Sequence, residues 1–335
     1  MLSPKRRFLS ALFGGRIDRP SAGTPTSVAT VDLMDEVGVF FPEAHLDAEK
    51  MATLAEATHT LLGFDSVAPL FSVITEAAAL GAEIDWGRRD WMPINVTSPW
   101  RDPADVRLPV DFVERPATRT ALDAIAILRR RLGDRVAIVG KVMGPWTLAY
   151  HMYGVQDFLM DLIIEPDRAR RFLDALMPIS LAFARAQVQA GADVVVVADH
   201  STGDMVRAET YRDFLLPVHR ALTRELGAPT IFHCCGRSLD RMEYYAQAGF
   251  DCYHFESVND AREVVRIVDG RISLAGNVSA PNALLNGTPE DVRRQVDYAI
   301  AAGVQIIAPE CAVPLVTPNA NLRALTAAVA AHGPA

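Results

Sequence analysis

The sequence predicts an α/β protein folded as a TIM (β/α)8 barrel. Eight short apolar runs recur along the chain, and stretches with helical periodicity separate most neighbouring runs. The uninterrupted valines in DVVVVAD are typical of a parallel strand that is covered on both faces. The alternating β/α pattern also fits a doubly wound open sheet, but no GxGxxG or P-loop motif favours that alternative. The predicted strands are 64–71, 92–96, 135–144, 192–199, 229–235, 250–256, 272–278 and 304–310.

The helices between these strands carry recognisable start and stop signals. One helix is predicted to begin after Thr288 as its N-cap, with Pro289 at the first helical position, and to end before Gly303. A second helical segment, 208–229, contains Pro217, which predicts a break between two helical pieces. These signals support the alternating pattern.

Composition limits the class of protein. With 335 residues, half of them hydrophobic, the chain can bury a large core, and we expect one barrel domain, 1–335, that includes an N-terminal extension, 1–25, with a short basic surface helix. No apolar run approaches the roughly 20 residues that cross a bilayer, so no membrane association is expected. The net charge of -8 argues against nucleic acid as the main partner. Without a secretory signal or a disulfide-like cysteine spacing, the expected compartment is the reducing cytoplasm.

A group of metal-binding residue types falls at the ends of predicted strands. Side chains on a strand alternate between its two faces, so His233 and Cys235 point the same way and Cys234 points the other way. Cys311 follows another predicted strand, and Glu256 ends a third. One imidazole, two thiolates and a carboxylate make a tetrahedral zinc shell, although cobalt or iron also binds thiolate-rich sites.

The competing interpretation is that cysteines are simply small buried residues. This interpretation is favoured for Cys252, which lies in the middle of its predicted strand. His254 alternates with Cys252 and Glu256 on one face, so we expect a core histidine or one that supports a metal ligand.

Barrel enzymes carry their active sites at the carboxyl ends of the strands, and further residues fall at that level. We expect these residues to form the wall of a substrate or cofactor site. Asp199 is expected to contact substrate and take part in catalysis, or to cap a helix. The predicted wall residues are Met143, Gly144, Asp199, His200 and Asn277.

The motifs resemble those of the uroporphyrinogen decarboxylase superfamily, and within it the branch of methylcobamide:coenzyme M methyltransferases. The resemblance covers nearly the whole chain and is most specific in IFHCCGRS, LAGNVSAPNALLNGTPEDV and PECAVPLVTPNANLRAL. It implies a barrel that carries zinc on a His-x-Cys pair and a distant cysteine, here His233, Cys235 and Cys311. A strand-end acid can complete such a shell, and Glu256 is the matching position.

The chain departs from the decarboxylases of that superfamily in two segments. Their arginine-rich N-terminal motif is replaced by 24–38, TPTSVATVDLMDEVG, which has no arginine. Their Phe-Ser-Asp motif is replaced by Phe71, Ser72 and Val73. The guanidinium groups and the acid that would handle a substrate with many carboxylates are therefore missing.

The resemblance implies methyl transfer from a methylated corrinoid, carried by a partner corrinoid protein, to a small thiol such as coenzyme M that zinc has activated. Zinc lowers the pKa of a bound thiol, and Glu256 would leave the metal when the thiol arrives. Arg237, near the predicted mouth, is expected on the surface and not in an anion site. The alternatives are a tetrapyrrole decarboxylase, methyl transfer to a folate, a zinc hydrolase, and a binding protein without catalysis.

Overall fold

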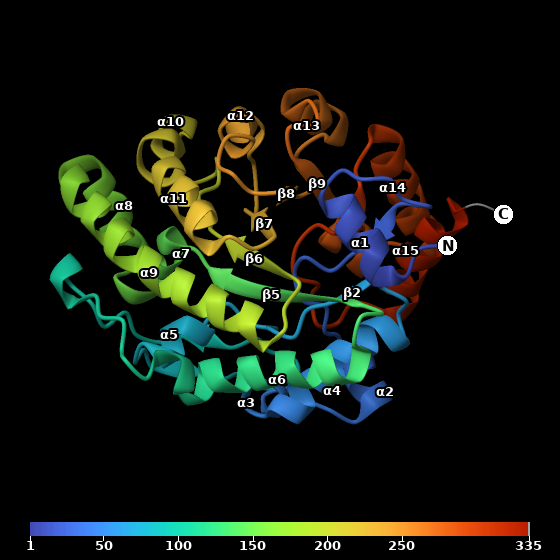
Figure 1. Cartoon of the computed structure of the whole chain (residues 1–335), viewed down its shortest axis with the longest axis horizontal. Coiled ribbons are helices and arrows are strands. Elements are labelled where there is room, and N and C mark those ends of the chain that lie inside the picture. The colour runs from blue at the N-terminus through green and yellow to red at the C-terminus, as the bar shows by residue number, and fades with distance from the viewer. Residues whose placement is uncertain (334–335) are drawn as a thin grey trace.

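The computed structural model describes residues 1–333 and confirms the predicted barrel. Eight parallel strands form one sheet in the order β1-β10-β9-β8-β7-β6-β5-β2. Figure 1 shows these strands at the centre, surrounded by helices. The barrel strands are β1 (Ser21–Ala22), β2 (Ser66–Val67), β5 (Ala137–Met143), β6 (Val194–Ala198), β7 (Thr230–His233), β8 (Cys252–His254), β9 (Ser273–Val278) and β10 (Ile306–Pro309).

Hydrogen bonds between β1 and β2 close the sheet. The backbone N–H of Asp65 donates to the carbonyl oxygen of Ala22 at 2.7 Å. The N–H of Ala22 donates to the Asp65 carboxylate at 3.0 Å, and the N–H of Thr24 donates to the Ser66 hydroxyl at 2.8 Å. Because side chains contribute to this seam, the two short edge strands meet without a regular ladder. The open-sheet alternative is therefore excluded.

Helices cover the outside of the barrel (Figure 1). The α-helices are α1 (Pro4–Leu12), α2 (Val31–Val37), α3 (Glu43–Leu46), α4 (Ala48–Thr60), α5 (Thr75–Ala79), α6 (Pro116–Leu132), α7 (Pro145–Met152), α8 (Val155–Ile164), α9 (Pro166–Ala190), α10 (Ala208–Thr210), α11 (Leu216–Leu226), α12 (Met242–Tyr245), α13 (Ala261–Val268), α14 (Pro289–Ala302) and α15 (Asn319–Ala331). Short 3-10 turns lie at Pro103–Asp105, Phe112–Glu114 and Leu239–Arg241, and π-helical turns at Tyr211–Leu215 and Ala280–Leu285.

The predicted helix signals are confirmed. The Thr288 side chain caps α14 by accepting from the N–H of Asp291, and Gly303 ends the helix with a φ of 102°. Pro217 lies in the first turn of α11, directly after the π-helical turn at Tyr211–Leu215. Local sequence therefore sets these boundaries.

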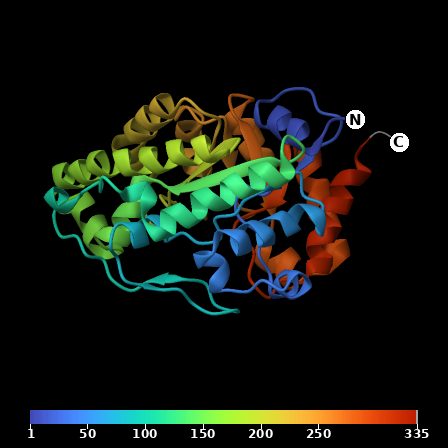
Figure 2. The ribbon, with the colours of Figure 1, turned by 60° about the horizontal axis from the view of Figure 1, so that its bottom comes forward.

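The prediction that 92–96 is a barrel strand is wrong. These residues contribute β4 (Ile94–Asn95), which pairs antiparallel with β3 (Ile84–Asp85) in a two-stranded ribbon. Figure 2 shows this teal ribbon outside the barrel. The first barrel strand is instead β1, inside the segment predicted as an extension. Its two residues lie in a stretch rich in Pro, Gly and Thr, which carries no strand periodicity.

The prediction of a surface helix at the N-terminus is also wrong. On α1, Phe8, Ala11 and Leu12 are fully buried. They pack against the small and branched side chains inside the barrel, among them Val139, Val196, Ile231, Cys252 and Ile306. The helix therefore closes the amino-terminal end of the barrel, because an otherwise open interior would expose these residues to water.

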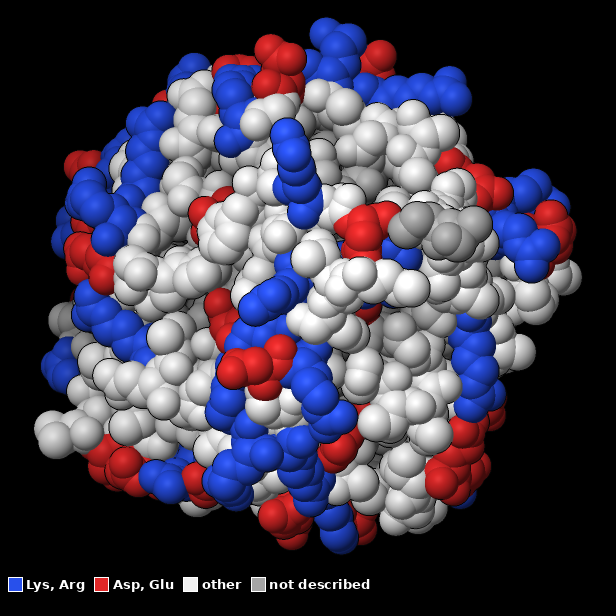
Figure 3. Space-filling view, turned by 45° about the vertical axis from the view of Figure 1, so that its right-hand side comes forward, with Lys and Arg blue, Asp and Glu red and all other residues white. Residues whose placement is uncertain are grey.

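Within residues 1–333, none of the helices has the length and apolar character needed to span a bilayer. On the face shown in Figure 3, Lys and Arg side chains are interspersed with Asp and Glu. A run of Lys and Arg side chains extends down the middle of this face, with Asp and Glu side chains beside it.

A buried ion-pair network fastens α1 to the barrel seam. The Arg7 guanidinium donates to Asp65 at 2.9 Å and to Asp18 at 2.8 Å. Asp65 also accepts from the Ser21 hydroxyl at 3.1 Å. The exposed fractions of the Arg7 and Asp65 side chains are 5% and 2%, so this pair is screened little by solvent.

We predict that Arg7→Met lowers the free energy of unfolding by about 3 kcal/mol, because it leaves the Asp65 carboxylate buried without its main cation. Urea unfolding followed by circular dichroism measures this change. The neighbouring exposed Arg6 provides the matched control, Arg6→Met, which should stay within about 0.5 kcal/mol of the wild type. Equal midpoints for the two variants would contradict a structural role for the network.

Candidate active site

Three predicted metal ligands converge at the carboxyl ends of the barrel strands. His233 Nε2 lies 3.1 Å from Cys235 Sγ, the two sulfur atoms of Cys235 and Cys311 are 3.3 Å apart, and Cys311 Sγ lies 3.5 Å from His233 Nε2. The donor atoms come from β7 and from the residue that follows Glu310, after β10. The barrel thus joins residues 76 positions apart in the chain.

Strand geometry and one glycine position the His-x-Cys pair. His233 ends β7 with its ring on the inner side of the barrel, whereas Cys234 is buried on the outer side, as predicted. After Cys235 the chain turns through Gly236, which has a φ of +79°. A Cβ there would lie 2.4 Å from the Thr202 hydroxyl oxygen, so both conformation and space require glycine.

His254 supports His233 from the neighbouring strand. The ring of His233 lies over that of His254 at 4.6 Å, and His233 Nδ1 donates to the carbonyl oxygen of His254 at 3.3 Å. This hydrogen bond places the proton on Nδ1 and leaves the lone pair of Nε2 directed toward the two cysteines, which is the arrangement of a metal-binding imidazole. The His254 ring is fully buried and its Nε2 is hydrogen-bonded to the carbonyl oxygen of Pro309 at 2.8 Å, which confirms the prediction of a core histidine.

The two thiols form an unequal pair. A hydrogen bond from Cys235 lowers the pKa of Cys311 well below its usual value, helped by His233. The bond to Cys311, together with burial, raises the pKa of Cys235. In contrast, burial raises the pKa of Cys234 to about 11, and Cys252 is fully buried in the barrel interior, as predicted. The reactive sulfur is therefore confined to Cys235 and Cys311.

The donor set fits a zinc ion. Tetrahedral zinc with its usual bond lengths separates neighbouring N and S ligand atoms by roughly 3.5 to 3.8 Å. The observed separations of 3.1 to 3.5 Å are close to these values and need only a small outward movement. Two soft thiolates and one imidazole also match the ligand preference of zinc.

Glu256 lies near the three ligands but not among them. Its carboxylate is outside the group whose donor atoms all lie within 4.8 Å of one another. Burial and the charges of Cys311 and Glu310 raise the pKa of Glu256. Its role as a displaceable fourth ligand and catalytic group stays a prediction.

A cavity of about 460 Å³ opens beside the three ligands. Met143, Asp199 and His200 line it, as expected for wall residues. Its other lining residues include Thr26, Phe71, Ser72, Val73, Met92, Lys141, Thr147, Tyr150, His151 and Val155. Gly144 and Asn277 are not among the lining residues, so their predicted contacts with a cofactor stay unsupported by the geometry.

Gly144 and Asp199 have close structural contacts instead. A Cβ on Gly144 would lie 2.2 Å from the Asp199 carboxylate, so the residue must be small. Asp199 accepts from the N–H groups of Thr147 at 2.6 Å and Trp146 at 3.3 Å, at the start of α7, and bonds to His219 at 3.0 Å. The helix-capping alternative therefore describes its contacts with α7, and its catalytic role stays a prediction.

Three buried polar residues in and near the cavity wall, Lys141, Glu76 and His45, were not predicted from the sequence. Lys141 lies in the middle of β5, and Glu76 accepts from the N–H of Met143 at 2.7 Å. His45 is stacked on Phe41 with its ring centroid 4.0 Å away. A lysine inside the apolar run AIVGKVM is the signal that could have revealed this group, since lysine is rarely buried without a purpose.

The two segments that differ from the decarboxylases both reach the cavity. Thr26 and the run Phe71, Ser72 and Val73 line its wall. None of these four side chains carries a charge. Arg237 lies elsewhere, with 72% of its side chain exposed and paired with Asp204 at 2.7 Å, which confirms its predicted surface position.

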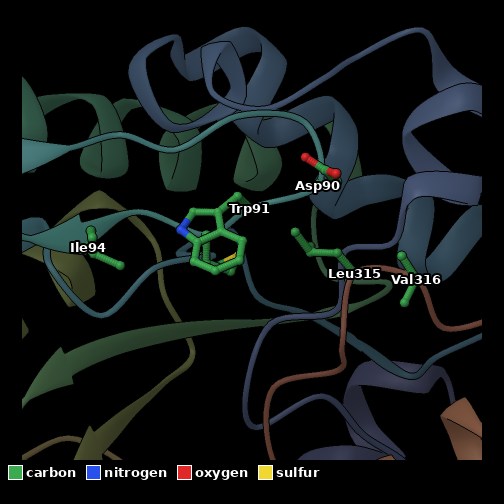
Figure 4. A pocket seen from close by; sticks show the side chains of 6 residues that line it. Asp90, Trp91, Ile94, Leu315 and Val316 are labelled. Atoms are coloured by element: carbon green, nitrogen blue, oxygen red, sulfur yellow. The ribbon is translucent and has the colours of Figure 1, made fainter.

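A second, more open hollow lies next to the cavity. Figure 4 shows Trp91 and Ile94 from the β3–β4 segment opposite Leu315 and Val316, with Asp90 at the edge. Met92 lines both hollows, so the two are adjacent. The exposed fractions of Trp91 and Val316 are 55% and 64%, which makes this rim apolar and accessible.

Comparison with known proteins identifies the family. The model of the family "Uroporphyrinogen decarboxylase (URO-D)" matches residues 3–332. A methylated-thiol--coenzyme M methyltransferase of Methanosarcina mazei is 34% identical over 96% of this chain and 88% of its own length. The methylcobamide:CoM methyltransferase MtaA of Methanosarcina barkeri is 33% identical over 97% and 96%. A solved structure described as a methyltransferase from Methanosarcina mazei superposes with a TM-score of 0.96, at 31% identity and 99% coverage of both chains.

The chain belongs to the uroporphyrinogen decarboxylase family. Within that family it belongs to the methylcobamide:coenzyme M methyltransferase branch, since these relatives match it over nearly their full lengths. The predicted family, branch and enzyme class, methyltransferase, are thereby confirmed.

We predict that iodoacetamide at neutral pH modifies Cys311 first and Cys235 next, and leaves Cys234 and Cys252 unmodified. Lowering of the pKa of Cys311 favours its thiolate, whereas burial protects the other two cysteines. Mass spectrometry of peptides identifies the modified sites. Prior addition of zinc should protect both reactive cysteines, and unfolding should expose all four. Modification unaffected by zinc would contradict a shared metal site.

We predict that Asp199→Ala lowers the free energy of unfolding by about 2 kcal/mol, because the N–H groups at the start of α7 and the His219 ring lose their acceptor. Asp199→Asn keeps an acceptor oxygen for the N–H groups of α7, so its free energy of unfolding should fall by less than that of Asp199→Ala. Urea unfolding measures both variants. Unchanged stability with lost activity would instead support a catalytic role for Asp199.

Proposed function

We propose that the protein is a zinc-dependent methyltransferase that moves a methyl group from a methylated corrinoid to a small thiol. The observation that carries the proposal is the convergence of His233, Cys235 and Cys311 within 3.5 Å at the barrel mouth. The relatives at 33% and 34% identity support it, because their names include methyl transfer to coenzyme M.

The proposed metal would be held by His233, Cys235 and Cys311. Zinc bound there would supply Lewis acidity that lowers the pKa of a substrate thiol and makes it a nucleophile at neutral pH. The protein's own contribution is to hold the donor atoms in place. His254 fixes the tautomer of His233, and the apolar wall around Phe71 and Met143 restricts water.

We propose that Glu256 would be a fourth residue holding the metal, and that it would give up this place to the acceptor thiol. Its half-buried carboxylate lies near Cys311, whose charge helps to raise its pKa. Glu256 would act as a placeholder on the metal and not as a general base, so the proton of the acceptor thiol would leave to solvent.

The methyl donor is proposed to be a corrinoid carried by a partner protein. The cavity of about 460 Å³ has the size of a site for a small molecule, so a corrinoid macrocycle would rest on the mouth and not inside. The apolar rim formed by Trp91, Ile94 and Val316 supplies a surface for such contact. Because free thiols are needed, we place the reaction in a reducing compartment such as the cytoplasm.

The other functions have less support. Decarboxylation of a tetrapyrrole needs charged groups that Thr26 and Phe71–Val73 do not provide. A methyltransferase with a folate acceptor, or a zinc hydrolase, would use the same three metal ligands. Either one would differ from the proposed enzyme because its turnover would not depend on an added thiol. A binding protein would take up zinc and corrinoid without demethylation.

We predict about one zinc per purified chain and thiol-dependent demethylation of methylcobalamin, which is followed by the change in its visible spectrum. The double variant Cys235→Ala, Cys311→Ala should contain no zinc, because both thiolate ligands are gone. Its rate of demethylation should be at least about 1,000-fold lower than that of the wild type. The adjacent substitution Cys234→Ala is the matched control, and this variant should keep both the zinc and the wild-type rate of demethylation. Zinc without demethylation would disprove methyl transfer, and a metal-free protein would disprove the site.

A further inference from the structure

A chain of buried hydrogen bonds links the three loops that carry Cys235, Glu256 and Cys311. Two buried polar side chains, those of Glu310 and Asn259, make these bonds, and their residues are 6% and 1% exposed. The bonds reach the direct sequence neighbours of the two thiolate ligands and of the acid, namely Gly236, Ser257 and Glu310. The network therefore runs one residue away from each of these groups.

The Glu310 carboxylate joins the ends of three neighbouring strands, β8, β9 and β10. Its Oε2 atom accepts from the N–H of Ser257 at 2.7 Å, in the loop after β8. Its Oε1 atom accepts from the N–H of Ala280 at 2.7 Å and from the hydroxyl of Ser279 at 3.2 Å, in the loop after β9. Because Glu310 directly precedes Cys311, the segment that leads into this cysteine is fixed to both neighbouring loops.

Asn259 makes the corresponding connection between the loop after β8 and the loop after β7. Its side-chain oxygen accepts from the N–H of Ser238 at 2.8 Å. Its amide nitrogen donates to the carbonyl oxygens of Gly236 at 2.9 Å and Glu256 at 3.3 Å. The turn that follows Cys235 is thereby fixed to the loop that carries Glu256.

The network leaves the ligand atoms themselves available. Each of its bonds ends on a backbone group or on the Ser279 hydroxyl, whereas the sulfur atoms of Cys235 and Cys311 contact each other and His233. Buried polar groups are costly to leave unpaired, so these bonds keep the loop backbones in one arrangement. Residues that stand behind metal ligands in this way orient them and raise the affinity of the site.

We propose that Glu310 and Asn259 are positioning residues of the metal site, which set the separation of Cys235 and Cys311 and hold the backbone beside Glu256. Metal affinity then depends on two residues that do not bind the metal. This inference rests on the proposed zinc-dependent function. Because the loop after β8 is fixed by its backbone, Glu256 can give up its place on the metal by a movement of its side chain alone.

The test measures the zinc affinity of the wild type, Glu310→Gln and Asn259→Asp by competition with a chromophoric chelator. Glu310→Gln replaces one acceptor oxygen by an amide that cannot accept from a loop N–H, and Asn259→Asp removes the donor to Gly236. The Kd for zinc should rise about 10- to 100-fold in each variant. The visible absorption of Co2+ bound in place of zinc should also change, because it follows the geometry of the ligands.

Two controls separate positioning from general effects on the protein. Arg7→Met weakens the fold at the opposite, closed end of the barrel and should keep the wild-type affinity for zinc. Glu225→Gln removes the charge of an exposed glutamate on α11 and should also keep it. Circular dichroism at the temperature of the titration checks that each variant is folded. Asn259→Asp carries the test by itself if Glu310→Gln does not fold.

Three outcomes would overturn the proposal. Unchanged zinc affinity and an unchanged cobalt spectrum in a folded variant would remove the substituted residue from the positioning role. An equal loss of affinity in Arg7→Met would show that zinc binding follows overall stability. A wild type that binds no zinc would refute the metal site together with this proposal. If the wild type binds zinc but demethylates no corrinoid, methyl transfer is refuted, while the affinities of the variants still decide the role of Glu310 and Asn259.

Discussion

The architecture depends on one buried carboxylate, that of Asp65, at the seam of the barrel. It accepts from the N–H of Ala22, the hydroxyl of Ser21 and the guanidinium of Arg7, so the same group joins β1 to β2 and fastens α1 below them. The Arg7 guanidinium neutralises the buried charge of Asp65, and the other two donors satisfy hydrogen-bond acceptor positions of the same carboxylate. Closure matters to the site because β7 and β10 are not neighbours, and a closed barrel brings their ends to one mouth.

The active-site cavity combines soft sulfur and imidazole donors with one buried lysine. The inner face of β7 and the loop after β10 supply soft donors, and His254 orients the imidazole among them. Two strands away from β7, β5 supplies the Lys141 ammonium to the wall of the same cavity. The two segments that replace the charged motifs of the decarboxylases present uncharged side chains to the cavity, namely Thr26 and Ser72. The same family barrel can therefore serve different chemistry through a few side chains at its mouth.

The parts of the fold with strong periodicity could be predicted from the sequence. Alternation correctly separated His233 from Cys234 and buried Cys252, because a strand fixes the direction of each side chain. The strand β1 could not be predicted, since two residues held by side-chain hydrogen bonds leave no periodic signal. The alternating segment at 92–96 has a real strand pattern, but only tertiary contacts place it outside the barrel. Lys141 was missed because apolar periodicity gives no weight to one charge in a buried run.

The closed end of the barrel also bears on the order of addition in catalysis. With α1 and the apolar layer around Val139 and Ile231 filling the amino-terminal end, the described cavity communicates with solvent through its mouth. A macromolecule that docks over that mouth shuts in whatever lies beneath it. If the methyl donor docks there as proposed, the small reactant would enter before the large one and depart after it. The position of one short helix would then impose a sequence of binding without any moving lid.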